Sequence, residues 1–245
     1  MLEVACIVKK GKWPVNDDRA AVNGVVIEQG LHCAKSENAC LAVVCDGVGG
    51  SKHGWKAAEI AAGYFADIHS RNVLLENIEE HVSEANSKIL SVRETDREYS
   101  GMLTTIAGIY IVGDDCVTFN VGDSRVYRYR AFLYQMSTDH SQRQLQLDLG
   151  LIPAAGAESE IHRCLGGGSA KPAIVEGIGR VFDNDMYVLC TDGVWGVLND
   201  EDFENILSQD IEISKAAELL VELAVERESD DDLSVIIIRR VDSVG

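Results

Sequence analysis

Hydrophobic residues follow two different spacings in the first part of this chain, and each spacing predicts a different kind of element. The apolar runs Met1 to Lys9 and 41 to 45 have the length of β-strands, and the second suits a strand buried on both faces. From Gly54 to about Asn72, and again from Leu75 to Val92, apolar residues recur at helical spacing. The first part therefore predicts strands followed by two helices.

The middle of the chain has the composition of β-strands separated by tight turns. The runs Thr104 to Val112, Asp115 to Val121 and Arg125 to Arg130 are rich in β-branched and aromatic residues, with short Gly and Asp turns between them. We expect them to form an antiparallel meander. Residues 139 to 171 are polar with little periodicity, and a loop of this length inside a compact domain is more often functional than idle.

The last third predicts a strand, two helices and a closing strand. They cover Asp185 to Cys190, about 200 to 208, about 213 to 227, and Leu233 to Val241. Strands outnumber helices, and the helices come in two pairs with most of the strands between them. This order favours an α+β fold in which helices cover sheets. No internal repeat or Pro-rich linker divides the chain, so residues 1–245 are expected to form a single domain.

The charge balance narrows the classes of partner. The 245 residues include 40 acidic and 22 basic side chains, and the net charge of −18 repels nucleic acid and anionic membranes. No apolar run reaches the ~18 residues that span a bilayer, and no signal peptide is visible. We expect a cytoplasmic protein, with a monomer as the default. The seven cysteines contain no CxxC pair, which argues against structural zinc.

Aspartates stand at the edge of an apolar strand in five separate places. One such Asp is common in turns, but strands packed in two sheets can bring all five places to one edge. Converging carboxylates repel one another unless cations neutralise them, and oxygen ligands without His or Cys indicate Mg²⁺ or Mn²⁺. The residues are Asp17 and Asp18 in NDDR, Asp46 after LAVVC, Asp123 after TFNVG, Asp192 after MYVLCT, and Asp231 before LSVIII.

The segment DGVGG, residues 46 to 50, allows two interpretations. In the first, Asp46 supplies a carboxylate oxygen and Gly47 turns its backbone carbonyl toward the same ion, while the glycines let the chain pass close to a metal. In the second, a Gly-rich turn before a helix cradles a phosphate on backbone N–H groups. The chain contains neither a GxxxxGKS/T nor a GxGxxG motif, so the nucleotide-binding interpretation is the weaker one.

Seven segments, taken in order, resemble the motifs of the metal-dependent serine/threonine phosphatases of the type 2C family in their compact bacterial form. Any one segment is unspecific, but together they run from residue 16 to residue 234 in the family order. The segments are NDDR, CDGVGG, MLTT, VGDSRVY, MSTDHS, LCTDGVWGVL and DDLS.

The resemblance implies a four-layer α-β-β-α sandwich with two central, mainly antiparallel sheets. It also implies a binuclear centre of Mn²⁺ or Mg²⁺ at one end, and a flap-like insertion at about 139–171 beside it. Four carboxylates would be catalytic: Asp46, Asp192, Asp231 and Asp18. As metal ligands, Asp46 would bridge both ions, and the Gly47 carbonyl would bind one of them. Asp192 and Asp231 would complete the ligand shell of one ion, and Asp17 and Asp18 would hold the other, directly or through water. Asp123 with Asp192 would form a weaker third metal site.

The activity that the resemblance implies is hydrolysis of phosphoserine and phosphothreonine on proteins, by a water that the two ions activate. The partners would be phosphoproteins, and a serine/threonine kinase would oppose the enzyme. The main alternative is a pseudophosphatase that keeps the fold and binds partners without catalysis. The principal metal carboxylates are all present, which favours the enzyme.

One position on the substrate side departs from the family pattern. The family carries an Arg shortly before the Asn-x-Asp motif, where it binds the substrate phosphate through two hydrogen bonds, but Trp13 stands there in this chain. The candidates for substrate contacts are therefore Lys12, Trp13 and Arg19, with Trp13 as an apolar platform. Lys12 is not equivalent to Arg, because its ammonium is a point charge without the planar fork.

Two further residues bear on the chemistry. Val48 stands where some relatives carry a His that is proposed to protonate the leaving group, and Val cannot donate a proton. His53 and His140 are the candidates for that role, although a surface or structural role is the alternative for each. Arg125, in the segment VGDSRVY, is expected to form a structural ion pair rather than to bind phosphate.

Overall fold

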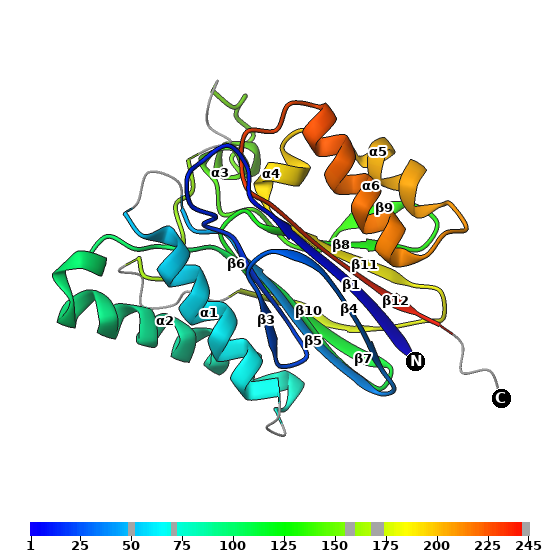
Figure 1. Cartoon of the computed structure of the whole chain (residues 1–245), viewed down its shortest axis with the longest axis horizontal. Helices are drawn as coiled ribbons and strands as arrows, with labels where there is room; N and C mark the ends of the chain where they lie inside the picture. Colours follow the sequence, from blue (N-terminus) through cyan, green and yellow to red (C-terminus); the bar gives the residue numbers. More distant parts are fainter. Residues whose placement is uncertain (49–51, 70–72, 155–159, 168–173, 242–245) are drawn as a thin grey trace.

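Two six-stranded sheets pack face to face, and each carries helices on its outer side, so that four layers result (Figure 1). Every strand pairing in the described part of the chain is antiparallel. The predicted α-β-β-α sandwich is therefore confirmed. This computed structural model describes residues 1–48, 52–69, 73–154, 160–167 and 174–241, with the backbone alone at 174–178.

Strands that are distant in sequence lie side by side in both sheets. In the first sheet, the first and the last strands of the chain, β1 and β12, pair with each other, and β12 and β11 are the two middle strands. In order across that sheet, the strands are β4 (Gly30–Ser36), β1 (Leu2–Lys9), β12 (Leu233–Arg240), β11 (Met186–Cys190), β8 (Arg125–Tyr129) and β9 (Leu133–Gln135). Across the second sheet they are β10 (Ile174–Arg180), β7 (Asp115–Val121), β6 (Ile106–Val112), β5 (Ala39–Cys45), β2 (Arg19–Val22) and β3 (Val25–Ile27).

The helices cover the two outer faces in pairs, as the sequence predicted. Helices α1 (Gly54–His69) and α2 (Ile78–Thr95) lie on the second sheet, and α5 (Asp200–Leu207) and α6 (Ile213–Glu226) lie on the first (Figure 1). The shorter helical segments are the 3₁₀ turns Leu75–Asn77 and Arg97–Tyr99, α3 (Gln142–Asp148) and α4 (Asp192–Trp195). The predicted helix over 54–72 is confirmed as far as His69, and residues 70–72 lie outside the described residues.

Three hydrophobic clusters hold the layers together, one between the sheets and one under each pair of helices. The face of α1 that meets the second sheet carries small side chains such as Ala57, Ala58 and Ala61, which bring the helix close to the strands, with Phe65 and Ile68 filling the space beyond them. Most described residues of the central strands β5, β6 and β12 are buried, so each forms a continuous apolar run.

The predicted three-stranded meander is wrong at its third strand. Strands β6 and β7 pair in the second sheet, but β8 belongs to the first sheet, where it pairs with β11 and β9. The chain changes sheet at Gly122, whose φ of +110° favours glycine and where an added Cβ would lie 2.7 Å from the Cβ of Thr105. A turn signal in the sequence marks the end of a strand but does not say which sheet the next strand joins.

Several elements were not predicted, and most of them are short. Strands β2, β3 and β9 have four residues or fewer, while β4 is a sheet edge on which exposed and half-buried residues alternate. Such strands take their stability from the neighbour they pair with, which the sequence pattern does not reveal.

The segment 139–171 is attached to the body of the protein at more than one point. It contains α3 and an internal bridge between Ser141 and Ile161. Leu165 pairs with Thr104 of the body, and the Gly166 N–H donates to Oδ1 of Asn86 at 2.8 Å. Residues 155–159 and 168–171 lie outside the described residues, so the flap stays a prediction. Among the helices that the structure describes, none is long and apolar enough to cross a membrane.

Candidate active site

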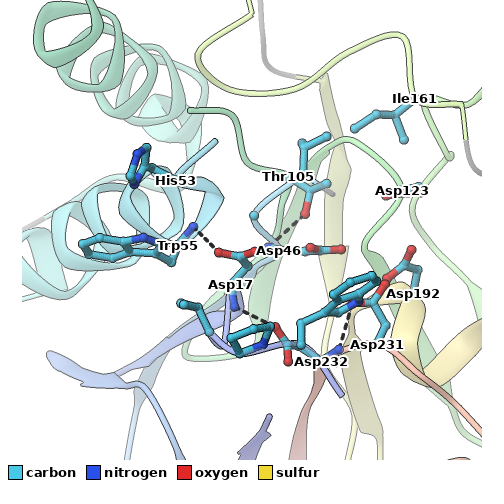
Figure 2. A pocket seen from close by; sticks show the side chains of 15 residues that line it. Asp17, Asp46, His53, Trp55, Thr105, Asp123, Ile161, Asp192, Asp231 and Asp232 are labelled. Atoms are coloured by element: carbon cyan, nitrogen blue, oxygen red, sulfur yellow. Dashed lines mark hydrogen bonds between the residues drawn. The ribbon is translucent and has the colours of Figure 1, made fainter. Parts of the chain in front are cut away.

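The strand ends that carry the aspartates meet at one edge of the sandwich, around a cavity of about 760 Å³ (Figure 2). Asp46 follows β5 of the second sheet, while Asp192 follows β11 and Asp231 precedes β12 of the first. The two sheets thus contribute from opposite sides to the same cavity. The lining residues are Trp13, Pro14, Val15, Asp17, Asp46, Gly47, Val48, His53, Trp55, Thr105, Asp123, Ile161, Asp192, Asp231 and Asp232.

The carboxylates are close enough to perturb one another. Burial, followed by the charges of Asp192, Asp18 and Asp123, raises the pKa of Asp46 well above its ordinary value. Burial and the charge of Asp192 raise the pKa of Asp123 to about 7. Burial, followed by the charge of Asp231, raises the pKa of Asp192 to about 6. Such a group of acids favours either protons or cations.

The donor set matches a hard divalent cation. The side chains around the Asp46 carboxylate offer oxygen ligands, and no Lys or Arg occurs among the cavity-lining residues that the structure describes. Within the described residues, no three His, Cys, Asp or Glu side chains form a ready-made metal cage. An ion held here would therefore complete its shell with backbone carbonyls and waters, as Mg²⁺ commonly does.

Gly47 brings its backbone against the start of helix α1. A Cβ added at Gly47 would lie 2.4 Å from the carbonyl carbon of Gly54, and a Cβ added at Gly54 would lie 2.8 Å from that of Gly47. Only glycine fits at either position without a shift of the backbone. Packing against the helix start therefore requires glycine here, while close passage of the chain beside a metal ion stays a prediction.

Asp17 is held by hydrogen bonds on three sides. Its Oδ1 accepts the backbone N–H of Trp55 at 2.8 Å, and its own N–H donates to Oδ2 of Asp232 at 2.6 Å (Figure 2). Its backbone carbonyl accepts the N–H of Gly47 at 3.1 Å. Asp17 therefore ties the loop after β1 to both the glycine turn and the first helix.

Asp18 does not line the cavity. Its side chain is only 1% exposed, and its Oδ2 accepts the hydroxyl of Thr191 at 2.8 Å. Burial raises the pKa of Asp18 well above its ordinary value, against the opposing effect of the hydrogen bond from Thr191. Of the two adjacent aspartates, Asp17 faces the cavity and Asp18 supports it from behind, next to Asp192.

Asp232 flanks the predicted ligand Asp231, and the sequence leaves open which acid of the run 230–232 would bind metal. Its two carboxylate oxygens accept the backbone N–H groups of Gly11 at 2.7 Å and Asp17 at 2.6 Å. It thereby fastens the loop after β1 to the start of β12, with Asp231 beside it in the cavity wall. The repeated acids before LSVIII were the available signal, but a sequence does not show which of them faces inward.

Thr105 and Ile161 are site residues that the sequence analysis did not single out. The hydroxyl of Thr105 accepts the backbone N–H of Asp46 at 3.2 Å and lies 2.6 Å from the hydroxyl of Ser124. Thr105 therefore links the Asp46 turn to the turn that carries Asp123. Its position in the segment MLTT was the only sequence signal, and Ile161 offered none.

The three candidates for substrate contacts are separated by the structure. Lys12 and Arg19 do not line the cavity, whereas Trp13 does. Lys12 pairs with the Asp230 carboxylate, and the buried Arg19 guanidinium donates to the backbone carbonyls of Asn16 at 2.8 Å and Asp18 at 2.7 Å. Of the three, only Trp13 is placed to touch a molecule in the cavity.

Arg125 forms the structural ion pair that the sequence predicted. Its guanidinium donates to both carboxylate oxygens of Asp139, with the shortest contact at 2.6 Å, and stacks 3.5 Å from the ring centre of Trp195. These contacts fix the start of strand β8, two residues after Asp123.

Comparison with known families identifies the class of protein. A family model described as Protein phosphatase 2C matches residues 17–225, which is most of the chain. The chain therefore belongs to the protein phosphatase 2C family, as the seven segments predicted.

Two curated relatives show how far the likeness extends. The serine/threonine protein phosphatase PstP of Mycobacterium tuberculosis is 30% identical over 229 residues, covering 88% of this chain. This chain spans only 44% of the length of PstP. The serine/threonine phosphatase stp of Listeria monocytogenes is 26% identical over 231 residues, with 89% of each chain covered.

A solved structure supports the fold. The catalytic domain of serine/threonine protein phosphatase PstP, crystallised in complex with 2 manganese ions, matches with a TM-score of 0.82 and 25% sequence identity. The match covers 99% of this chain and 100% of that domain. Both sheets and their helices are thus part of the shared architecture.

Proposed function

We propose that this protein hydrolyses phosphoserine and phosphothreonine on proteins in a reaction that depends on Mn²⁺ or Mg²⁺. The observation that carries the proposal is the convergence of Asp46, Asp192, Asp231 and Asp17 from both sheets on one cavity. The family match and the manganese ions in the PstP catalytic domain support it. The phosphoprotein substrates and an opposing serine/threonine kinase are part of the proposal.

The residues available for two ions follow from their placement around the cavity. Asp46 stands between the groups from the two sheets and is suited to bridge, with the Gly47 carbonyl beside it. Asp192 and Asp231 would complete one shell and Asp17 would serve the other, with Asp18 acting through its neighbours. Asp123 with Asp192 is the candidate for a third ion. Bound divalent ions lower the pKa of water and neutralise charge on a phosphoryl group.

The protein's own contribution is to fix these groups before substrate arrives. Thr105 holds the backbone of Asp46, and Trp55 and Asp232 hold Asp17, so the Asp17 carboxylate and the turn that carries Asp46 are fixed in place. Preorganised charge of this kind stabilises a transition state more than mobile charge does. The aromatic and apolar side chains of Trp13 and Ile161 border the same cavity.

The test is release of phosphate from a phosphothreonine peptide, with and without Mn²⁺. We expect metal-dependent release in the wild type and its loss in Asp192→Asn. Asp210→Asn removes the same charge from an exposed position far along the chain from the cavity residues and should retain activity. Binding of Mn²⁺ to both variants, followed by calorimetry, separates loss of metal from loss of chemistry.

The alternative is the pseudophosphatase. It would bind Mn²⁺ or a phosphopeptide without releasing phosphate, and the observation that favours it is Trp13 in place of the usual phosphate-binding Arg. Release of phosphate by the wild type at a rate that depends on Mn²⁺ would exclude this alternative.

A further inference from the structure

The cavity carries an excess of negative charge that two metal ions do not cancel. Six Asp residues line it, and two divalent cations would leave a formal charge of −2. No Lys or Arg contributes to the described lining, and the whole chain has a net charge of −18. A substrate phosphate adds further negative charge. A peptide with positive side chains beside the phosphate would therefore be attracted, and an acidic peptide repelled.

The two lysines next to Trp13 in the loop after β1 are already engaged. Lys12 pairs with Asp230, and the Lys10 ammonium donates to the backbone carbonyl of Trp13 at 2.7 Å. Lys10 and Lys12 line a separate hollow, together with Glu228 and Asp230. They therefore do not supply the missing positive charge inside the cavity.

Trp13 offers a surface for a cation at the mouth of the cavity. Its side chain is 63% exposed, while its backbone belongs to a loop that is firmly attached. Gly11 in this loop donates to Asp232, and the Lys12 N–H donates to the Asp230 carbonyl at 3.1 Å. The indole thus projects from a fixed base, so little ordering is needed when a partner binds.

Indole rings already hold cations elsewhere in this protein. The Arg125 guanidinium lies 3.5 Å from the ring centre of Trp195, and the Lys56 ammonium lies 5.6 Å from that of Trp55, which also lines the cavity. Trp13 is the exposed member of the three tryptophans and has no ring or cation contact among the described residues. Its face is accessible to a ligand cation, and Trp is the best side chain for such a contact.

Resting on the proposed function, we infer that the site selects phosphopeptides that carry Lys or Arg next to the phosphorylated residue, and that Trp13 receives this cation. The Arg that usually binds phosphate is thereby replaced by a residue that recognises the peptide instead. In this arrangement the metal ions bind the phosphate, and the residues that flank the phosphorylated residue determine which peptides are selected.

The test compares three phosphothreonine peptides that differ only in flanking residues, which are Arg, Gln or Glu. With Mn²⁺ present, we expect kcat/KM to be about tenfold higher for the Arg peptide than for the Glu peptide, mainly because KM is lower. This ratio of the two kcat/KM values should fall when added salt screens the charges of the cavity. Trp13→Leu keeps apolar bulk without the ring quadrupole and should reduce the ratio by about threefold. Phe132→Leu, at an equally exposed aromatic outside the cavity lining, should leave the ratio unchanged.

Two readouts keep the inference distinct from the proposed function. The substrate p-nitrophenyl phosphate has no flanking residues, so its turnover tests only the chemistry. Fluorescence anisotropy of labelled phosphonate peptides tests only binding. If the protein turns over p-nitrophenyl phosphate but shows equal kcat/KM for all three peptides, the inference is overturned and the proposed function is retained. A preference for Glu would also overturn the inference. A ratio that Trp13→Leu does not change would remove Trp13 from the mechanism of selection.

Discussion

The carboxylate of Asp17 accepts the backbone N–H of Trp55 at 2.8 Å, and this single contact joins the candidate metal site to the first helix. Trp55 is the second residue of α1, whose first turn has N–H groups without partners inside the helix. Asp17 satisfies one of them from a loop 38 residues earlier. Site geometry and helix stability are therefore coupled through one side chain.

Substitution of Asp17 should separate these two roles. Asp17→Ala removes the helix cap, and we expect the free energy of unfolding in EDTA to fall by about 0.5–2 kcal/mol. Asp17→Asn retains an oxygen acceptor for the Trp55 N–H and should cost less, while both variants bind Mn²⁺ more weakly. Urea unfolding followed by circular dichroism and Mn²⁺ titration by calorimetry check the two effects. Equal destabilisation by Ala and Asn would contradict the capping role.

Metal binding should stabilise the fold. Burial and the charge of Asp192 raise the pKa of both Asp46 and Asp123, so a cation relieves repulsion that the native state holds and the unfolded chain does not. Mn²⁺ at about 100 times its dissociation constant should add about 2.7 kcal/mol to the free energy of unfolding. Differential scanning calorimetry in Mn²⁺ and in EDTA measures this. Asp192→Asn should lose most of this Mn²⁺-dependent increase in the free energy of unfolding, and Asp210→Asn should keep it. The same increase in both variants would argue against metal binding at Asp192.

Arg125 and Asp139 should be energetically coupled. The Arg guanidinium donates to both oxygens of Asp139 and to the Tyr127 hydroxyl at 2.9 Å, and it stacks on Trp195. Lys cannot reproduce this fork, so Arg125→Lys is expected to lower the free energy of unfolding by about 1–3 kcal/mol. A double-mutant cycle with Asp139→Asn should give a coupling energy of about 0.5–3 kcal/mol. Additive effects of the two substitutions would show that the two side chains are not energetically coupled.

His140 should make stability depend on pH. Its Nδ1 accepts the backbone N–H of Gly122 at 3.0 Å, and its backbone N–H donates to the Gly122 carbonyl at 2.9 Å. Burial, with the nearby charges of Arg163 and His162, lowers the pKa of His140 to about 4. The unfolded chain, with a His pKa of about 6.5, binds more protons in this range, so stability falls as the pH drops from about 6.5 toward 4.

A substitution isolates this contribution from those of the carboxylates. His140→Asn keeps an acceptor for the Gly122 N–H but does not titrate. Between pH 7 and pH 5 the wild type should lose about 2 kcal/mol more free energy of unfolding than this variant. Guanidinium chloride unfolding in EDTA at both pH values measures the difference. Parallel losses in the two proteins would show that His140 does not titrate on unfolding.

The sequence alone determined the elements with strong periodicity and the chemistry of the strand ends. Helices α1 and α6 and strand β12 were predicted within a few residues, because their apolar spacing is a local property. The all-oxygen donor set was predicted from the aspartates that follow or precede apolar strands, because a strand that ends in Asp places it at the edge of a sheet. Both inferences depend only on residues that are close together in the sequence.

The tertiary structure decided which sheet each strand joins and which way each carboxylate faces. Strand β8 follows β7 along the chain but pairs with β11 in the other sheet, and Asp17 faces the cavity while the adjacent Asp18 is buried against Thr191. Lys12 and Arg19 lie within six residues of Trp13 in sequence, yet of the three only Trp13 lines the cavity. Each outcome depends on hydrogen bonds and packing between distant segments, and these are fixed only when both sheets are in place.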